Sequence, residues 1–199
     1  MSEQIIKYED IQPNLQTGDI INCEHKDIFW RLIGHTAVCY RDPLTDMLFW
    51  FESTSRNNVS GISGVQMNPM GLILNNYPGK VYVRQLEKLP GFEPTGSPFE
   101  FIEKHRESSY PNYHTRQGRW KLILSALDIP LFGKDIAEYH GTDEGIFCTE
   151  LVVRFLRWLG IMYPAGLCAN EFEPDDLRKH KIDKYLMPKC FYHAEIRIK

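Results

Sequence analysis

The stretch GIFCTELVVRFLRWLG, residues 145–160, predicts one helix that carries a cysteine, Cys148, in its first turn. Glu150 and Arg154 stand four residues apart with the acid first, which is the favourable order for an ion pair along a helix. Gly160 follows the last apolar position and suits a C-terminal cap. The apolar residues recur at helical spacing and form one stripe, which consists of Leu151, Val152, Phe155, Leu156 and Leu159.

The position of Cys148 within this helix gives it a chemical meaning. Residues 142–145 are polar and acidic, so the helix is expected to begin close to the cysteine. The first turn is the positive end of the helix dipole, where a thiolate is favoured over a thiol. A thiolate at a helix start can serve as the nucleophile of a cysteine hydrolase, and the general base would be a histidine elsewhere in the chain.

Composition and charge restrict the class of protein. The chain has 199 residues, of which 43% are hydrophobic and 25% charged, and this predicts one globular domain at residues 17–199 after an N-terminal leader at residues 1–16. A net charge of −3 does not indicate the excess of basic residues that binding to nucleic acid or a membrane surface would require. No apolar run is long enough to span a bilayer. Residues 1–14 lack a signal-peptide pattern, and the five cysteines are an odd number. We therefore expect reduced thiols in the cytoplasm or a cytosol-like compartment rather than a disulfide framework.

The remaining patterns predict an α+β fold, in which strands come first and helices follow. Beyond the hairpin described below, strands are expected at residues 17–23, 64–68, 80–86 and 190–198. Helices are expected at residues 97–107, 119–127 and 174–177, the first of which begins with a capping box and a proline. Two segments are expected to border Cys148, a short aromatic segment at residues 27–32 and an irregular rim or lid at residues 130–145.

Residues 34–40 and 47–53 predict a β-hairpin. Both segments are rich in β-branched, aromatic and apolar residues. The residues between them contain an Asp-Pro pair, which is typical of a turn. We expect the hairpin to close symmetrically about Pro43 and Leu44.

The same closure pairs Tyr40 with Met47 and places His35 directly across from Glu52, with their Cβ atoms about 5 Å apart. A slip of one residue would move one of them to the other face of the sheet, so the contact between His35 and Glu52 depends on the loop.

His35, Glu52 and Cys148 fit the roles of base, orienter and nucleophile. The thiolate attacks a carbonyl carbon, the imidazole takes and returns the proton, and the carboxylate holds the ring. The backbone N–H of Cys148 can supply one oxyanion donor.

Four motifs resemble a known family. Gly18-Asp19-Ile20-Ile21, Gly34-His35-Thr36-Ala37-Val38 and Phe49-Trp50-Phe51-Glu52-Ser53 are similar to the second half of an NlpC-type papain-fold domain. Phe147-Cys148-Thr149-Glu150-Leu151-Val152 is similar to the cysteine helix of that fold, but here it comes last. The order histidine, polar residue, cysteine resembles the circularly permuted branch, which includes YiiX/YaeF-like amidases, their poxviral relatives and lecithin:retinol acyltransferase. The resemblance covers residues 17–177.

The resemblance implies a papain-like fold in which an antiparallel sheet or small barrel packs against the helix that carries the cysteine. It implies acyl chemistry on an amide, ester or thioester, by a hydrolase, amidase or acyltransferase that forms a thioester at Cys148. His35 and Glu52 are carried over by position as the other catalytic residues, and Asp19 as a structural residue. The implied substrate is a small lipid, an acyl-amino acid or a peptide, with no cofactor and no metal.

Other interpretations stay open. Cys148 can be a buried structural thiol, in which case the protein is a catalytically inactive binding module that keeps the fold. Cys190 with His193, and Cys23 with His25, have spacings seen in metal sites, but neither has a convincing second pair. The aromatic residues Phe29, Trp30, Trp50 and Phe51 are interpreted mostly as core. The sequence predicts no oligomeric state.

Overall fold

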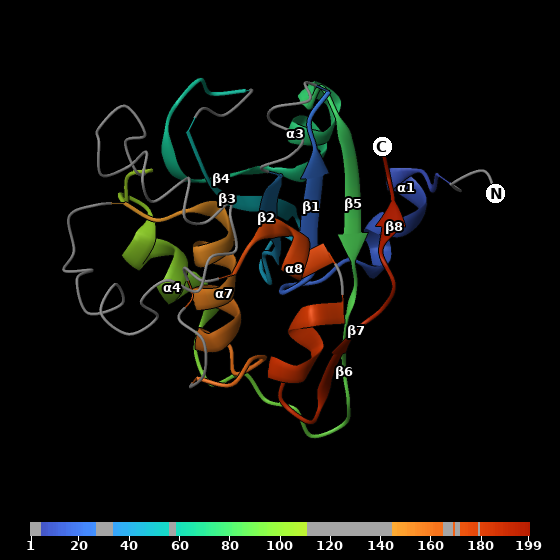
Figure 1. Ribbon diagram of the computed structural model, residues 1–199, viewed down its shortest axis with the longest axis vertical. Coiled ribbons are helices and arrows are strands. Elements are labelled where there is room, and N and C mark those ends of the chain that lie inside the picture. Colours follow the sequence, from blue (N-terminus) through green and yellow to red (C-terminus); the bar gives the residue numbers. More distant parts are fainter. Residues whose placement is uncertain are drawn as a thin grey trace.

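The computed structural model describes residues 5–26, 34–55, 59–110, 145–164, 169, 172–178 and 180–199. These residues form an α+β fold, as predicted, around a six-stranded sheet with the strand order β4-β3-β2-β1-β5-β8 (Figure 1). Every neighbouring pair in this sheet is antiparallel. Its strands are β1 (Ile20–Glu24), β2 (His35–Arg41), β3 (Leu48–Thr54), β4 (Gly64–Pro69), β5 (Lys80–Arg84) and β8 (Ile196–Arg197). A second, two-stranded sheet pairs β6 (Leu86–Lys88) with β7 (Cys190–Tyr192).

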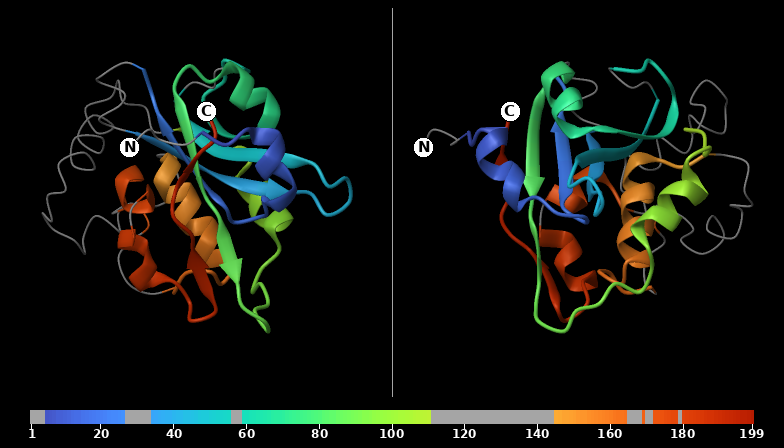
Figure 2. Two further views of the ribbon diagram at one scale, coloured as in Figure 1. Left: turned by 90° about the vertical axis from the view of Figure 1, so that its right-hand side faces the viewer. Right: turned by 180° about the vertical axis from the view of Figure 1, so that it is seen from behind.

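Helices cover both faces of the six-stranded sheet (Figure 2). On one face lie α7 (Cys148–Trp158), which contacts β2 and β3, and α8 (Pro174–Arg178), which contacts β1 and β2. On the other face lie α1 (Tyr8–Ile11) and α3 (Met70–Asn76). The remaining helical elements are α4 (Pro98–His105), which packs against α7, and the 3₁₀ helices η1 (Gln12–Asn14) and η3 (His180–Tyr185). Within the described ranges, no helix is both long and apolar enough to cross a membrane.

The alternation of side chains along the strands divides the core into two clusters, one on each face of the sheet. Ile20, Val38 and Phe51 belong to the first cluster, which includes the apolar residues of α7. Ile21 and Trp50, their neighbours along β1 and β3, belong to the second cluster, which includes residues of α1 and α3. The central strands are therefore buried on both faces.

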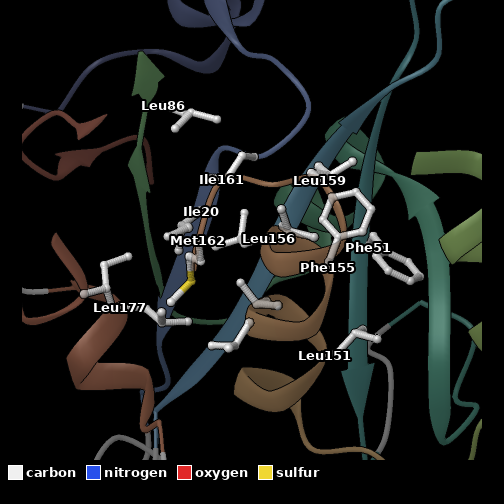
Figure 3. Packing of buried hydrophobic residues seen from close by; sticks show 14 of the residues in the cluster. Ile20, Phe51, Leu86, Leu151, Phe155, Leu156, Leu159, Ile161, Met162 and Leu177 are labelled. Atoms are coloured by element: carbon white, nitrogen blue, oxygen red, sulfur yellow. The ribbon is translucent and has the colours of Figure 1, made fainter. Parts of the chain in front are cut away.

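Helix α7 supplies much of the first cluster. Leu151, Phe155 and Leu156 are fully buried and pack toward the sheet (Figure 3). Burial of such a side chain stabilises the fold by about 1.5–3 kcal/mol. The helix ends at Trp158, and Gly160 lies just beyond it with a φ of +70° and donates its N–H to the Arg157 carbonyl at 3.0 Å. Glycine adopts this left-handed conformation without strain, so the predicted C-terminal cap is confirmed.

Two predicted strands are each divided between the two sheets. The strand expected at residues 80–86 ends as β5, and the chain continues into the small sheet as β6. The strand expected at residues 190–198 becomes β7 and β8. The two points at which the chain passes from one sheet to the other lie next to each other, because the His193 N–H donates to the Gln85 carbonyl at 2.9 Å. The two segments therefore bend together, a tertiary effect that alternation within either segment does not reveal.

Four described helical elements were not predicted, which are α1, η1, α3 and η3. Residues 5–16, assigned to the leader, contain α1 and η1, and Ile11 and Leu15 are buried in the second cluster. Helix α3 has seven residues, a length at which helix propensity alone is weak, and it forms where Met70 and Ile73 are buried beside β3. The predictions for residues 27–32, 119–127 and 130–144 lie outside the described residues.

Candidate active site

The hairpin of β2 and β3 closes one residue later than predicted. Tyr40 pairs with Phe49 and not with Met47. Because the centre of the loop moves by one residue, the partner of each β2 residue moves by two residues along β3. The physical reason is the Asp42 side chain, which accepts a hydrogen bond from the Leu44 backbone N–H at 3.1 Å. This Asx turn centres the loop after Leu44 instead of before it.

The shift corrects the predicted relation of His35 to Glu52. The two residues are not directly opposite, but a shift of two residues leaves both on the same face of the sheet. Diagonal neighbours on one face are about 7–8 Å apart, within reach of a long side chain. His35 Nε2 lies 2.6 Å from Glu52 Oε2. The two side chains therefore meet as the sequence predicted, but as diagonal neighbours and not as directly opposed residues.

The Glu52 carboxylate has a second partner on its own strand. Glu52 is only 4% exposed, and its Oε2 accepts a hydrogen bond from Trp50 Nε1 at 2.8 Å. Trp50 is fully buried, as the sequence indicated, but its indole also belongs to the polar network of the site. A signal for this contact exists in the sequence, because residues two apart on a strand point to the same face.

Cys148 is the first residue of α7 and is 8% exposed. The His35 ring and the Thr36 backbone N–H lie close enough to its sulfur to lower the pKa of the thiol as hydrogen-bond partners. The Thr149 hydroxyl oxygen lies 3.8 Å from the same sulfur. The structure therefore brings Cys148, His35 and Glu52, which come from opposite ends of the chain, next to one another in one series.

These contacts form at the beginning of β2. His35 pairs with Cys23 of β1 and so belongs to the face of the second cluster, whereas α7 packs over Val38 on the other face. Cys148 and His35 can meet because each is the first residue of its element. The site thus lies at an end of the sheet and not over its middle.

The start of α7 is fixed by neighbouring segments. The Ser53 hydroxyl of β3 donates to the Ile146 carbonyl, and the Ile146 N–H donates to the Ser109 carbonyl at 2.9 Å. The Glu150 carboxylate accepts from the Phe147 N–H at 3.4 Å. This bond satisfies one of the N–H groups that the beginning of a helix leaves without an intrahelical partner.

Glu150 differs from its predicted environment. The predicted apolar stripe did not include Glu150, but Glu150 is only 4% exposed. The predicted ion pair with Arg154 is present, and the arginine is half-exposed. Burial of this acid is tolerated because it is paired and lies in the first turn of α7, near the positive end of the helix dipole.

The pKa values of His35 and Cys148 shift in directions that favour an ion pair. Burial lowers the pKa of His35, but the hydrogen bonds to Cys148 and Glu52 and the charges of these groups raise it to about 10. Burial opposes ionisation of the Cys148 thiol, but the hydrogen bond and charge of His35, with the Thr36 N–H, lower its pKa below the ordinary value. Both shifts act in the direction of an imidazolium beside a thiolate.

A second thiol near the site has the opposite character. Cys23 is buried and lies directly across from His35 in the β1–β2 register. Burial raises the pKa of its thiol well above the ordinary value, although a hydrogen bond with Tyr77 acts in the other direction. Burial therefore favours the neutral thiol at Cys23, in contrast to Cys148.

Asp19 lies apart from this series and joins segments of the backbone. Its carboxylate accepts from the Gln16 N–H and from the Leu86 N–H, both at 2.8 Å. It is fully buried, and burial raises its pKa to about 7 although both N–H bonds act against this. Asp19 thus connects the turn before β1 to the start of β6.

The pairs considered as metal ligands have other surroundings. His193 Nε2 lies 2.8 Å from Glu87 Oε2, whereas Cys190 is buried. In the part of the chain that the structure describes, no group of three or more histidine, cysteine, aspartate or glutamate residues is arranged to hold a metal ion. The described cysteines, which are Cys23, Cys39, Cys148 and Cys190, are free thiols. No known protein-family model and no curated protein matches this chain.

Proposed function

We propose that this protein is a cysteine hydrolase or acyltransferase, with Cys148 as nucleophile, His35 as general base and acid, and Glu52 as orienter. The observation that carries the proposal is the continuous series of contacts from a thiol at a helix start, through an imidazole, to a buried carboxylate. A thiol that only fills the core needs no imidazole, and an imidazole that only fills the core needs no carboxylate behind it.

Acylation begins from the thiolate–imidazolium pair. Glu52 accepts from Nε2–H of His35, which leaves Nδ1 for the sulfur and the substrate. The thiolate attacks the carbonyl carbon of an amide, ester or thioester and forms a C–S bond. The bond to the leaving group then breaks, and the Nδ1 proton passes to that group. The backbone N–H of Cys148, at the first position of the helix, is placed to stabilise the developing oxyanion.

Deacylation reverses these roles. His35, now neutral, takes a proton from water or from an acyl acceptor, whose oxygen or nitrogen attacks the thioester carbon. The C–S bond breaks and the thiolate–imidazolium pair is restored. Glu52 holds the imidazole in one orientation through both steps and stabilises its positive charge, which is the orienter's part in such triads.

The fold supports assignment to the circularly permuted branch of the NlpC-type papain fold. In support stand an antiparallel sheet packed against the helix that carries the cysteine, and the chain order histidine, glutamate, cysteine. A lipid, an acyl-amino acid or a peptide is the substrate class that this assignment favours. The rival interpretation is a binding module that retains this arrangement without turnover.

A panel of nitrophenyl esters, from acetyl to long-chain acyl and aminoacyl groups, tests the proposal by intact-protein mass and nitrophenolate release. We expect an acyl adduct on Cys148 and catalytic release for at least one ester. Cys148→Ala removes both without unfolding the protein, and His35→Ala removes most of the rate. Cys190→Ala serves as a matched control, because it removes another buried thiol and leaves the reaction unchanged. Equal release by wild type and Cys148→Ala would support the binding module instead.

A further inference from the structure

The oxygen of Glu52 that faces His35 is held from two sides. Glu52 Oε2 lies 2.6 Å from His35 Nε2 and 2.8 Å from Trp50 Nε1. An indole N–H can only donate, so Glu52 Oε2 accepts from Trp50. The pKa of His35 is raised to about 10, and a protonated ring carries a proton on both nitrogens, so Nε2 is a second donor to the same oxygen.

We infer that Trp50 is a positioning residue of the site, whose indole N–H fixes the carboxylate oxygen of Glu52 that orients His35. The inference rests on the proposed function and adds to it a residue that acts through Glu52 without touching the substrate. Sequence reasoning treated Trp50 as core, and the hydrogen bond gives it this second role.

The surroundings of Trp50 make it a rigid donor. Its side chain is fully buried in the second cluster, and its ring centroid lies 6.3 Å from that of Tyr77. The indole is uncharged, so it donates a hydrogen bond to the carboxylate without neutralising the negative charge that attracts the imidazolium. A lysine or arginine at this position would weaken the attraction between Glu52 and His35, because it would neutralise the same carboxylate.

The loss of this donor has a defined consequence for Cys148. Without the indole N–H, the Glu52 side chain gains rotamers in which Oε2 no longer faces His35. The imidazolium then loses part of its stabilisation, and the thiolate beside it becomes less favoured. Trp50 therefore influences the sulfur through two intervening groups, Glu52 and His35.

The test is a double-mutant cycle of Trp50→Phe and Glu52→Ala, read by the iodoacetamide alkylation rate of Cys148 across pH. Phenylalanine keeps most of the buried ring and removes the donor. We expect Trp50→Phe alone to lower the rate at mildly acidic pH by about 3- to 10-fold and to move the midpoint upward. This is less than the effect of about 10- to 150-fold of a directly lost hydrogen bond to a charged group, because Trp50 acts through two intervening groups. In the Glu52→Ala background the same substitution should have no effect, because no carboxylate oxygen remains to be held.

A matched control is Trp158→Phe, which removes an indole hydrogen bond to the Ser97 carbonyl elsewhere on α7 and should leave the alkylation profile unchanged. Equal losses from Trp50→Phe in both backgrounds would overturn the inference and indicate a packing role alone. If Trp50→Phe fails to fold, benzothienylalanine at position 50 keeps the shape and replaces N–H by sulfur, with the same expectations. A wild-type Cys148 that reacts no faster than an unfolded control would instead contradict the proposed function itself.

Discussion

Among single residues, His35 and Glu52 hold different positions relative to the sulfur. The His35 ring interacts directly with the Cys148 sulfur, whereas Glu52 interacts with His35 and influences the sulfur only through that ring. An orienter contributes less to the rate than the base it orients. We therefore expect Glu52→Gln to slow turnover less than His35→Ala does, with both variants folded. Single-turnover acylation rates measure the difference.

Asp19 provides the comparison that would contradict this assignment. Its two backbone hydrogen bonds are structural, so Asp19→Asn should lower the melting temperature and leave the acylation rate of the folded protein unchanged. If Glu52→Gln had no effect while Asp19→Asn reduced acylation, the third residue of the site would be wrong.

The sequence predicted the three central residues because each has a local signal. Cys148 follows a polar segment and precedes an apolar stripe, and His35 and Glu52 lie on facing strands of one hairpin. Trp50 was interpreted mostly as core, because the packing of a hydrophobic aromatic residue on a strand is a sufficient explanation for its presence. The burial of Glu150 was not predictable, since it depends on the elements that surround α7 rather than on the helix itself.

At the scale of elements, the orientation of α7 depends on how its start is held against β3. Ser53 is fully buried, and its hydroxyl donates to the Ile146 carbonyl two residues before Cys148. Ser53→Ala should lower the free energy of unfolding by about 0.5–1.5 kcal/mol, the usual net value of such a bond. It should also slow alkylation of Cys148, because the helix start is less well fixed.

The matched control for Ser53 is Ser97, whose side chain accepts from the Glu100 N–H at the start of α4. Ser97→Ala should lower stability by about 0.5–2 kcal/mol, as for other N-cap replacements, without changing alkylation of Cys148. Similar alkylation rates in the two serine variants would show that the Ser53 bond stabilises the fold without positioning the cysteine.

Elements were predicted best where the signal is local. The helix of Cys148 and its glycine cap follow from periodicity and from one residue, Gly160. The hairpin register was wrong by two residues because the Asp42 side chain sets the turn, and a symmetric loop ignores that bond. The predicted strands at residues 80–86 and 190–198 were too long because each leaves one sheet for another where they meet.

For the whole molecule, the Cys148–His35 pair connects α7 to the sheet and should give stability a characteristic pH dependence. His35 has its pKa raised from 6.5 to about 10, so its contribution is complete below pH 6.5 and is lost as pH rises through about 10. Cys148 has its pKa lowered from 9.0, so its contribution is present above pH 9 and is lost as pH falls through the folded value.

The two effects together predict a plateau. Where the pH is above 6.5, above the folded pKa of Cys148 and below 9, the folded pair holds one proton, on the imidazole, and the unfolded chain also holds one, on the thiol, so stability does not change with pH. Urea unfolding of wild type, relative to the His35→Gln/Cys148→Ala double variant, should show a stabilisation that is constant in this range and declines above pH 9. A steady decline from pH 6.5 upward would mean that the histidine is charged without a thiolate beside it.

The most direct test of the central claim is the ionisation of Cys148 itself, measured as the ultraviolet difference absorbance of wild type minus Cys148→Ser across pH. The account predicts a thiolate band whose midpoint lies below the ordinary thiol value of 9.0, and a midpoint at or above that value in His35→Ala. A wild-type midpoint at 9.0 or higher, unchanged by His35→Ala, would contradict it and leave Cys148 as a core thiol.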